Sequence, residues 1–426
     1  MAGIFTRLYH LPLETTLERT AQKRAIVLPA LQTLATALVL ILAAAILHVG
    51  ESPYIAFAFT GAFVTQLMFR SEPRAVLFAI LAGAGFAGAY WLHHGALLAF
   101  YGSSVAIPGA FLGMGTMFVL AARWYWSDAG QRQMRFELAL AAALVPLLCV
   151  ASIVAVGPAI GLTPLTYDRV LYIFDAKLAA SNQPPPSWVI GRLFADHNWL
   201  RLACSYVYNS LPLGLAICLA LQWQDRHKKI WYALDLRWLS MTLGCIGFVL
   251  YQFCPAAGPV YLFPNEFPHV IPNLATLVAE PGFMREVPRN AMPSLHVGWT
   301  MLLLWNMRHR AWWIVLPAFL YVTMTAMATL GLGEHYLMDL VVAVPVALAL
   351  QAMWLRAEDS RHWIVMVVAF VVVLAWLFAF RTGVALSIPA GAATWAIAGV
   401  TAVVPIVVAW WMERTMRPRR AISGGI

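Results

Sequence analysis

The sequence predicts an all-α fold, a polytopic membrane bundle with about 12 transmembrane helices. Hydrophobic residues make up 62% of the 426 residues and charged residues 11%, whereas soluble domains have about 25% charged residues. The mean hydropathy is +0.74. The apolar residues are gathered in runs of about 20, the length that a helix needs to cross the hydrocarbon core. These observations together predict an integral membrane protein.

Apolar runs mark the expected spans in order along the chain. The first run follows a basic segment and is too long for the core of a signal peptide, so we expect an uncleaved first span. The run at 295–307 is short, and the run at 103–122 could also be re-entrant. The spans are expected near 25–48, 53–69, 75–98, 103–122, 137–158, 202–223, 231–253, 295–307, 311–331, 335–355, 363–380 and 386–411.

The distribution of Lys and Arg predicts the orientation. With both termini inside, 21 of the 28 basic residues lie on the cytoplasmic side, the excess that is typical of cytoplasmic loops. The net charge of +9 is therefore mainly a topology signal and a contact with anionic inner-leaflet lipid. Nucleic acid is not expected as a partner, because no basic stretch is interleaved with aromatic residues. The expected location is the bacterial inner membrane.

Two outer segments are long. Residues 159–201 contain an amphipathic stretch followed by three prolines at 184–186, which predicts an interfacial helix at the level of the lipid headgroups. Residues 254–293 are rich in proline and show little periodicity. Loops of this length are usually functional, and its position directly before Ser294 favours a lid over a site.

Two short stretches carry candidate chemistry, and each opens an apolar run on the outer side. They are residues 289–296, Arg-Asn-Ala-Met-Pro-Ser-Leu-His, and residues 333–339, Gly-Glu-His-Tyr-Leu-Met-Asp. His335 and Asp339 are four residues apart, so they are expected to share a helix face on which the carboxylate orients the imidazole. An oriented imidazole suits a nucleophile, and His296 suits an acid.

Each residue also has a simpler interpretation. A serine at a helix start, such as Ser294, is more often an N-cap, although its hydroxyl and the first N–H groups can also hold phosphate. A single histidine at a membrane interface, such as His296, is more often merely amphipathic. Asp339 is harder to explain in this way, because a carboxylate within an apolar helix is costly without a partner. His335 offers that partner, so the residues together favour a site.

The spacing Pro-Ser-x-His, followed about forty residues later by His-x-x-x-Asp, resembles the second and third motifs of the type-2 phosphatidic acid phosphatase superfamily. Together with Pro-Ala-Ala-Gly-Pro at 255–259 and Glu-His-Tyr at 334–336, these motifs are most similar to those of the inositol phosphorylceramide synthase-like branch. The resemblance covers roughly residues 165–355. The first motif, Lys-x6-Arg-Pro, has no counterpart, and Ala328 and Thr329 stand where the third motif normally begins with Ser-Arg.

The resemblance implies a six-helix phosphatase-like core within the bundle. Four regions follow from it. They are a cytoplasmic basic segment at 1–24, accessory transmembrane helices 1–4 at 25–136, a catalytic core at 137–358, and two C-terminal helices with a basic cytoplasmic tail at 359–426.

The resemblance also implies a two-step phosphoryl transfer without a metal or other cofactor. His335 would form a phosphohistidine while Asp339 holds its ring. His296 would protonate the leaving oxygen and then deprotonate the acceptor, which is water for a phosphatase and an alcohol for a phosphotransferase. The substrate would be a lipid-linked phosphoester at the periplasmic face, with its tail in the bilayer. The expected phosphate-binding residues are Ser294, Arg289, Arg285 and Arg201.

Three alternatives stay open. A transporter or flippase would have Gly- and Pro-interrupted spans in two matched halves. A non-catalytic lipid-binding member would fit the missing first motif, although the presence of His296, His335 and Asp339 argues against it. A metal hydrolase would need ligand spacing such as His-Glu-x-x-His. The five cysteines lack such spacing, and so do the other outer histidines, His48, His93, His94 and His269.

Overall fold

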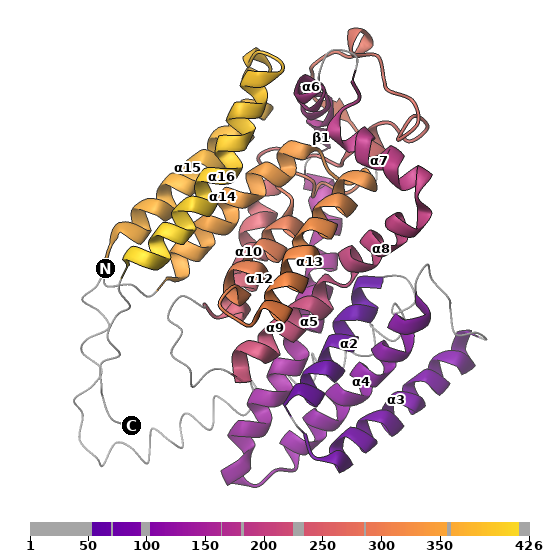
Figure 1. The fold of residues 1–426 in the computed structure, drawn as a ribbon. Coiled ribbons are helices and arrows are strands. Elements are labelled where there is room, and N and C mark those ends of the chain that lie inside the picture. The colour runs from indigo at the N-terminus through magenta and orange to yellow at the C-terminus, as the bar shows by residue number, and fades with distance from the viewer. Residues whose placement is uncertain are drawn as a thin grey trace.

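The computed structural model describes residues 53–69, 71–94, 103–162, 164–179, 183–224, 234–284, 287–355 and 359–416. Within these ranges the chain is a bundle of helices (Figure 1), which confirms the predicted all-α class. A two-stranded antiparallel sheet is formed by β1 (Leu165–Thr166) and β2 (Gly282–Phe283). The expected first span at 25–48 and the cytoplasmic segment at 1–24 lie outside the described residues.

The N-terminal helices form a group of their own, coloured indigo to magenta in Figure 1. Their buried side chains make a hydrophobic cluster separate from the main core, with Phe59, Phe111 and Met114 near its centre. The first helix of the group also packs against α9 of the main core. The group consists of α2 (Pro53–Met68), α3 (Pro73–His94), α4 (Ser103–Tyr125) and α5 (Ala129–Leu162).

The remaining helices make the larger part of the bundle. In chain order they are α6 (Asp168–Leu178), α7 (Pro186–Asp196), α8 (Asn198–Asn209), α9 (Leu211–Gln224), α10 (Leu236–Tyr251), α11 (Pro259–Leu262), η1 (Leu274–Thr276), α12 (Leu295–Met307), α13 (Trp312–Gly331), α14 (Leu337–Trp354), α15 (Arg361–Arg381), η2 (Val384–Ser387) and α16 (Ala392–Thr415). Proline is the first residue of α2, α3, α7 and α11, where its missing N–H and fixed φ suit a helix start.

A helix lies in each expected span from residue 53 onward, but the helices differ in length. Of those described, seven are long and apolar enough to cross a membrane, and α8 with α9, bent by 52°, could form an eighth span. α2 and α10 are shorter apolar helices, and α12 has 13 residues. The chain is thus an integral membrane protein. The matched pair of broken spans that a transporter would need is not found among the described helices, where one bent pair occurs.

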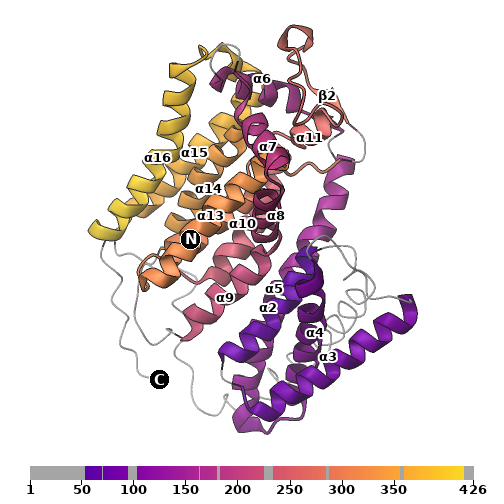
Figure 2. The ribbon, with the colours of Figure 1, turned by 45° about the vertical axis from the view of Figure 1, so that its right-hand side comes forward.

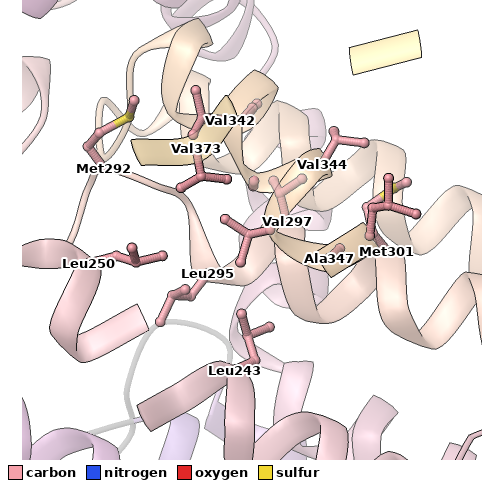
Figure 3. Packing of buried hydrophobic residues seen from close by; sticks show 14 of the residues in the cluster. Leu243, Leu250, Met292, Leu295, Val297, Met301, Val342, Val344, Ala347 and Val373 are labelled. Atoms are coloured by element: carbon pink, nitrogen blue, oxygen red, sulfur yellow. The ribbon is translucent and has the colours of Figure 1, made fainter. Parts of the chain in front are cut away.

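The centre of the main core is α14, which is buried over most of its length. α12 is enclosed in the same way, since most of its residues are buried. Both helices are apolar on all sides, as expected for helices surrounded by protein. Figure 3 shows how they pack against α10 and α15, through Leu243, Leu250, Val297, Val342 and Val373.

The two long segments at 159–201 and 254–293, which the sequence predicts to be outer, meet at the end of the bundle where α12 and α14 begin (Figures 1 and 2). Here the sequence predicted an interfacial amphipathic helix, but α6 is largely buried, with Leu171, Tyr172 and Phe174 inside the protein. Its apolar face packs against protein rather than lipid, because α14, α15 and α16 lie beside it.

The loop before Ser294, which the sequence suggested as a lid, is tied to the other outer segment. Side chains of α6 and α7 donate to its backbone carbonyl oxygens: Tyr172 Oη to Pro272 at 3.1 Å, Trp188 Nε1 to Val270 at 2.9 Å and Arg192 Nε to Pro268 at 3.3 Å. These bonds satisfy carbonyl groups that an irregular loop would otherwise leave unpaired. The loop is therefore an anchored part of this end of the bundle.

Candidate active site

The imidazole of His335 is buried at the start of α14, with hydrogen-bond partners at both nitrogens. Nδ1 lies 2.9 Å from the carbonyl oxygen of Ala291 and 3.4 Å from Oδ2 of Asp339, and Nε2 lies 3.3 Å from Oγ of Ser294. A carbonyl oxygen can only accept, so Nδ1 carries the proton. Nε2 therefore holds the lone pair, towards which the Ser294 hydroxyl can donate.

Asp339 links this ring to the first turn of α14. Its Oδ2 accepts from the backbone N–H of Tyr336 at 2.8 Å, the arrangement of a residue that caps its own helix. The spacing predicted that His335 and Asp339 share a helix face. The two side chains do meet, but for another reason: α14 begins at Leu337, and Tyr336 is extended. His335 thus reaches Asp339 from the turn that precedes the helix.

Ser294 occupies the N-cap position of α12, but its hydroxyl makes no capping hydrogen bond to the helix. It faces Nε2 of His335 instead. Its backbone N–H donates to the carbonyl oxygen of Asp339 at 3.0 Å, which joins the starts of α12 and α14 directly. The simpler interpretation of Ser294 as a capping side chain therefore does not describe its geometry.

His296 lies one residue into α12 among aromatic rings. Its ring stacks on Tyr208 of α8 with centroids 4.2 Å apart, and Nδ1 lies 3.3 Å from the Tyr208 hydroxyl. Tyr54 of α2 approaches from another side, at 5.6 Å between ring centroids. His296 is also near enough to His335 for the two rings to interact electrostatically. Sequence reasoning missed both tyrosines, because each lies far from His296 along the chain.

Arg289, one of the predicted phosphate ligands, is 1% exposed. Its guanidinium donates to the carbonyl oxygens of Val287 at 2.6 Å, Pro164 at 3.4 Å and Met284. These contacts hold the end of the loop against the residues just before β1. The structure therefore gives Arg289 a definite part in fixing the loop, and its role as a phosphate ligand stays a prediction.

The structure describes one of the other two predicted cations. Arg201 is on α8, where Nε and Nη2 donate to Oδ1 of Asn198 at 3.1 and 2.8 Å. It precedes Tyr208 by seven residues, almost two helical turns, so both residues are on the same face of α8. Arg285 lies outside the described residues.

The Pro-Ala-Ala-Gly-Pro stretch at 255–259 is the junction of the site. The carbonyl oxygen of Ala256 accepts from the N–H of Ala291 at 2.9 Å. Gly258 has φ +111°, and a Cβ there would lie 2.4 Å from the carbonyl oxygen of Glu334. Glycine alone accommodates this conformation and this close approach. The stretch therefore brings the residues next to both histidine motifs together.

Glu334 also lies near the two histidines, although in the sequence it was only a member of the Glu-His-Tyr motif that contains His335. It is half-buried. Its carboxylate interacts electrostatically with Tyr54, Tyr208 and Tyr261. Burial raises the pKa of Glu334 above its usual value, and His335 partly offsets this effect. A group of three or more His, Cys, Asp or Glu side chains that could hold a metal ion is not found in the part of the chain that the structure describes.

Comparison with known families matches residues 184–353 to a family model described as the PAP2 superfamily. The match supports membership of that superfamily. It suggests a phosphatase-type activity on phosphoesters. The matched range contains Ser294, His296, His335 and Asp339. Comparison with curated proteins and with solved structures gives no match, and the inositol phosphorylceramide synthase-like branch stays a prediction.

Proposed function

We propose that this protein is a lipid phosphatase or phosphotransferase that acts on a lipid-linked phosphoester at the extracytoplasmic face through a phosphohistidine. The observation that carries the proposal is the state of His335. Its Nδ1 is committed to the carbonyl oxygen of Ala291 and to Asp339, so the lone pair of Nε2 is directed away from them. A fixed, unprotonated imidazole nitrogen is what nucleophilic attack on phosphorus requires.

In the first step Nε2 of His335 attacks phosphorus. A P–N bond forms as the P–O bond to the leaving group breaks, and the leaving oxygen takes a proton from His296. Asp339 stabilises the positive charge that develops on the attacked imidazole, since Nδ1 keeps its proton beside the carboxylate.

In the second step the oxygen of water or of an alcohol attacks phosphorus. Its proton passes to His296, and the P–N bond breaks to release His335. His296 thus serves as acid in the first step and as base in the second, the two directions of one proton transfer. The Tyr208 hydroxyl suits both steps, because it can accept a hydrogen bond from Nδ1 or donate one to it.

The negative charge on the phosphoryl oxygens needs donors aimed at it. We propose the Ser294 hydroxyl and the first N–H groups of α12 as such donors, together with Arg201 and Arg285. Arg289 is proposed to act indirectly, by holding the loop before Ser294 in place, since its guanidinium donates to loop carbonyls. The position of the site where α12 and α14 begin suits a substrate with a phosphate head, because its tail can stay beside apolar helices in the bilayer.

The test uses purified full-length protein in detergent with a panel of phosphatidic acid, other phospholipids and polyprenyl phosphates, with and without candidate alcohols. Released phosphate and new phosphate esters of the added alcohol would be measured for the wild type, for His335→Ala and for His269→Ala. His269 is an exposed histidine of the outer loop, so it controls for the loss of an imidazole elsewhere.

We expect turnover in the wild type and in His269→Ala and its loss in His335→Ala. With the monoesters phosphatidic acid and polyprenyl phosphate, free phosphate as the product would make the protein a phosphatase, and a phosphomonoester of the added alcohol would make it a phosphotransferase. With phospholipids that are phosphodiesters, transfer to the alcohol would give a new phosphodiester. Full activity of His335→Ala would overturn the proposal. Absence of turnover from all three proteins across the panel would count against it and favour the non-catalytic lipid-binding alternative.

A further inference from the structure

The short outer helix α6 carries two carboxylates, Asp168 and Asp175, that the phosphoryl transfer does not use. Both side chains are fully buried, and their seven-residue separation puts them on one face of the helix. Both lie before residue 184, so the PAP2 match does not include them. A buried carboxylate is tolerated when its oxygens are hydrogen-bonded, and their partners show what these two hold.

Asp168 holds the loop beside the nucleophile. Its Oδ1 accepts from the N–H of Gly258 at 2.8 Å and from the N–H of Ala257 at 3.0 Å. The same oxygen accepts from the hydroxyl of Tyr336 at 3.2 Å. Tyr336 directly follows His335, and Gly258 packs on the carbonyl oxygen of Glu334, which directly precedes it. Asp168 is therefore bonded to the surroundings of His335 on both sides.

Asp175 holds the start of α14. Its Oδ1 accepts from the N–H of Leu337 at 3.1 Å, and its Oδ2 accepts from the hydroxyl of Ser187 at 3.0 Å. Leu337 is the first residue of α14, where a carboxylate satisfies an unpaired N–H and is favoured by the helix dipole. Because Asp339 takes the N–H of Tyr336, the two residues after His335 each donate to a buried carboxylate.

The C-terminal hairpin holds α6 from its other side. Lys177 Nζ donates to the carbonyl oxygens of Ile388, at 3.1 Å, and Leu386, and the N–H of Gly391 donates to the carbonyl oxygen of Lys177 at 2.9 Å. The ring of Phe174 packs edge-on against Phe380 of α15, with centroids 5.2 Å apart. Figure 2 shows α6 at the end of the bundle beside α15 and α16.

We propose that Asp168 and Asp175 are positioning residues for the nucleophile, and that the hairpin of α15, η2 and α16 braces them. The inference rests on the proposed function of His335. It assigns a role to α6 and to the last two helices, which lie outside the family match. Small displacements of a nucleophile are costly, because attack requires the reacting atoms to be held close together and aligned. Residues that fix the backbone on both sides of His335 therefore act on the rate rather than on substrate affinity.

The test compares Asp175→Leu, which removes the acceptor for the Leu337 amide, with Asp175→Asn, which keeps one. Asp196→Leu on α7 is the control, since that carboxylate is exposed. With phosphatidic acid in detergent micelles as the probe, Asp175→Leu should lower kcat about tenfold or more and leave KM within about twofold. Asp175→Asn should keep most of the activity. An unchanged kcat, or a change in KM alone, for Asp175→Leu would overturn the assignment.

A second readout separates this inference from the proposed function. Amide hydrogen exchange of the peptide that contains 335–340 should accelerate in Asp175→Leu, Asp168→Leu and Lys177→Met, while the peptide at 295–307 keeps its wild-type rate. Ser187→Ala gives a milder variant should the leucine variants not fold, with a smaller acceleration expected. Wild-type exchange in all of these variants would overturn the positioning role whether or not the enzyme turns over phosphatidic acid. Inactive wild-type protein would count against the proposed function alone.

Discussion

His335 and His296 lie at the same end of the bundle, yet their surroundings are of opposite kinds. His335 is held at three points by polar groups: a backbone carbonyl, a carboxylate and a hydroxyl. His296 is held by the faces and edges of aromatic rings, with a single hydroxyl of Tyr208 at its Nδ1. A nucleophile needs one nitrogen fixed in one protonation state. A group that gives and takes a proton must instead be accommodated in both its protonated and its neutral form.

The two regions also draw on different parts of the chain. The polar contacts around His335 come from α6, α14 and the outer loop, with Asp168, Asp175 and Asp339 all buried there. The rings around His296 come from α8, from its own helix α12, and from α2, a member of the N-terminal group. The site therefore joins helices that the sequence divides between an accessory region and a core. Variants on either side should therefore affect different steps, if the surroundings of His335 serve the nucleophile and those of His296 serve proton transfer.

The largest difference is expected between His335→Ala and His296→Gln when the leaving group is changed. Loss of the nucleophile should reduce kcat by about 10³-fold or more on every substrate. Loss of the acid should lower kcat by about 10²–10⁴-fold on a phosphate ester of a lipid alcohol, such as phosphatidic acid. It should lower kcat much less on p-nitrophenyl phosphate, whose leaving group needs no proton. Steady-state rates of both variants on both substrates check this. Equal losses on the two substrates for His296→Gln would contradict its role as the acid.

Asp339→Asn sharpens the His335 side of the comparison. The amide can donate to Nδ1 and so favour the wrong tautomer, with the proton on Nε2, as in the comparable substitution of a catalytic triad. We expect kcat to fall by about 10²-fold or more, with little change in KM. The measurement is kcat and KM for phosphatidic acid, with thermal unfolding as the control for stability. Activity close to that of the wild type would show that the carbonyl of Ala291 fixes the tautomer without Asp339.

Tyr208→Phe tests the His296 side with a smaller effect. The substitution keeps the stacked ring but removes the hydroxyl from Nδ1, and a hydrogen bond to a charged group contributes about 1.5–3 kcal/mol. We expect kcat to fall about tenfold and the pH–rate profile to move, because the protonated form of His296 loses a partner. Tyr125→Phe is the control, since that ring is exposed at the end of α4, with an expected change in kcat of less than about twofold. A pH–rate profile of Tyr208→Phe that matches the control would argue that Tyr208 serves packing alone.

The smallest effect concerns stability. Burial raises the pKa of Asp175 to about 7, against the hydrogen bonds from Ser187 and Leu337 and with the charge of Asp339 acting in the same direction as burial. In the unfolded chain the same carboxyl titrates near pH 4. The folded state thus binds the proton more tightly, so this contribution to stability is full below about pH 4, falls as pH rises and levels off above about pH 7.

Thermal unfolding of the wild type and of Asp175→Asn in detergent, between pH 5 and 8, measures this contribution. The midpoint temperature of unfolding should fall more steeply with pH for the wild type than for the variant, because only the wild type has a carboxyl group at position 175 that ionises in this pH range. Parallel curves would mean that Asp175 titrates at an ordinary pKa in the folded protein.

Much of the fold and part of the site followed from local features of the sequence. Apolar runs predict helices well, because each helix must be hydrophobic where it meets lipid or protein. They do not fix length: the run at 295–307 forms a helix of 13 residues that is enclosed by protein rather than a full span. The contact of His335 with Asp339 was expected from their spacing, but its cause is the turn before α14.

What the sequence could not show depends on long-range contacts. In the sequence, Asp168 and Asp175 look like the polar face of an interfacial helix. Periodicity shows that the face is polar, but not whether it contacts water or, as here, the buried N–H groups of a neighbouring loop and helix start. The sequence predicts Arg289 as a phosphate ligand, and the contacts of its guanidinium with loop carbonyls are seen only in three dimensions. Tyr208 carries no local signal at all. Gly258 did stand in a family-like motif, but its close approach to Glu334 appears only in three dimensions.

The proposed transfer of the phosphoryl group to Nε2 of His335 is tested most directly by trapping the phosphorylated protein. Wild-type protein would be mixed with phosphatidic acid and quenched rapidly at alkaline pH, which preserves phosphohistidine. Peptide mass spectrometry would then identify the residue, and phosphorus NMR the ring nitrogen. Phosphate is expected on Nε2 of His335, in equal amounts in the wild type and in the control variant His269→Ala. Phosphate on His296, or on Nδ1 of His335, would contradict it.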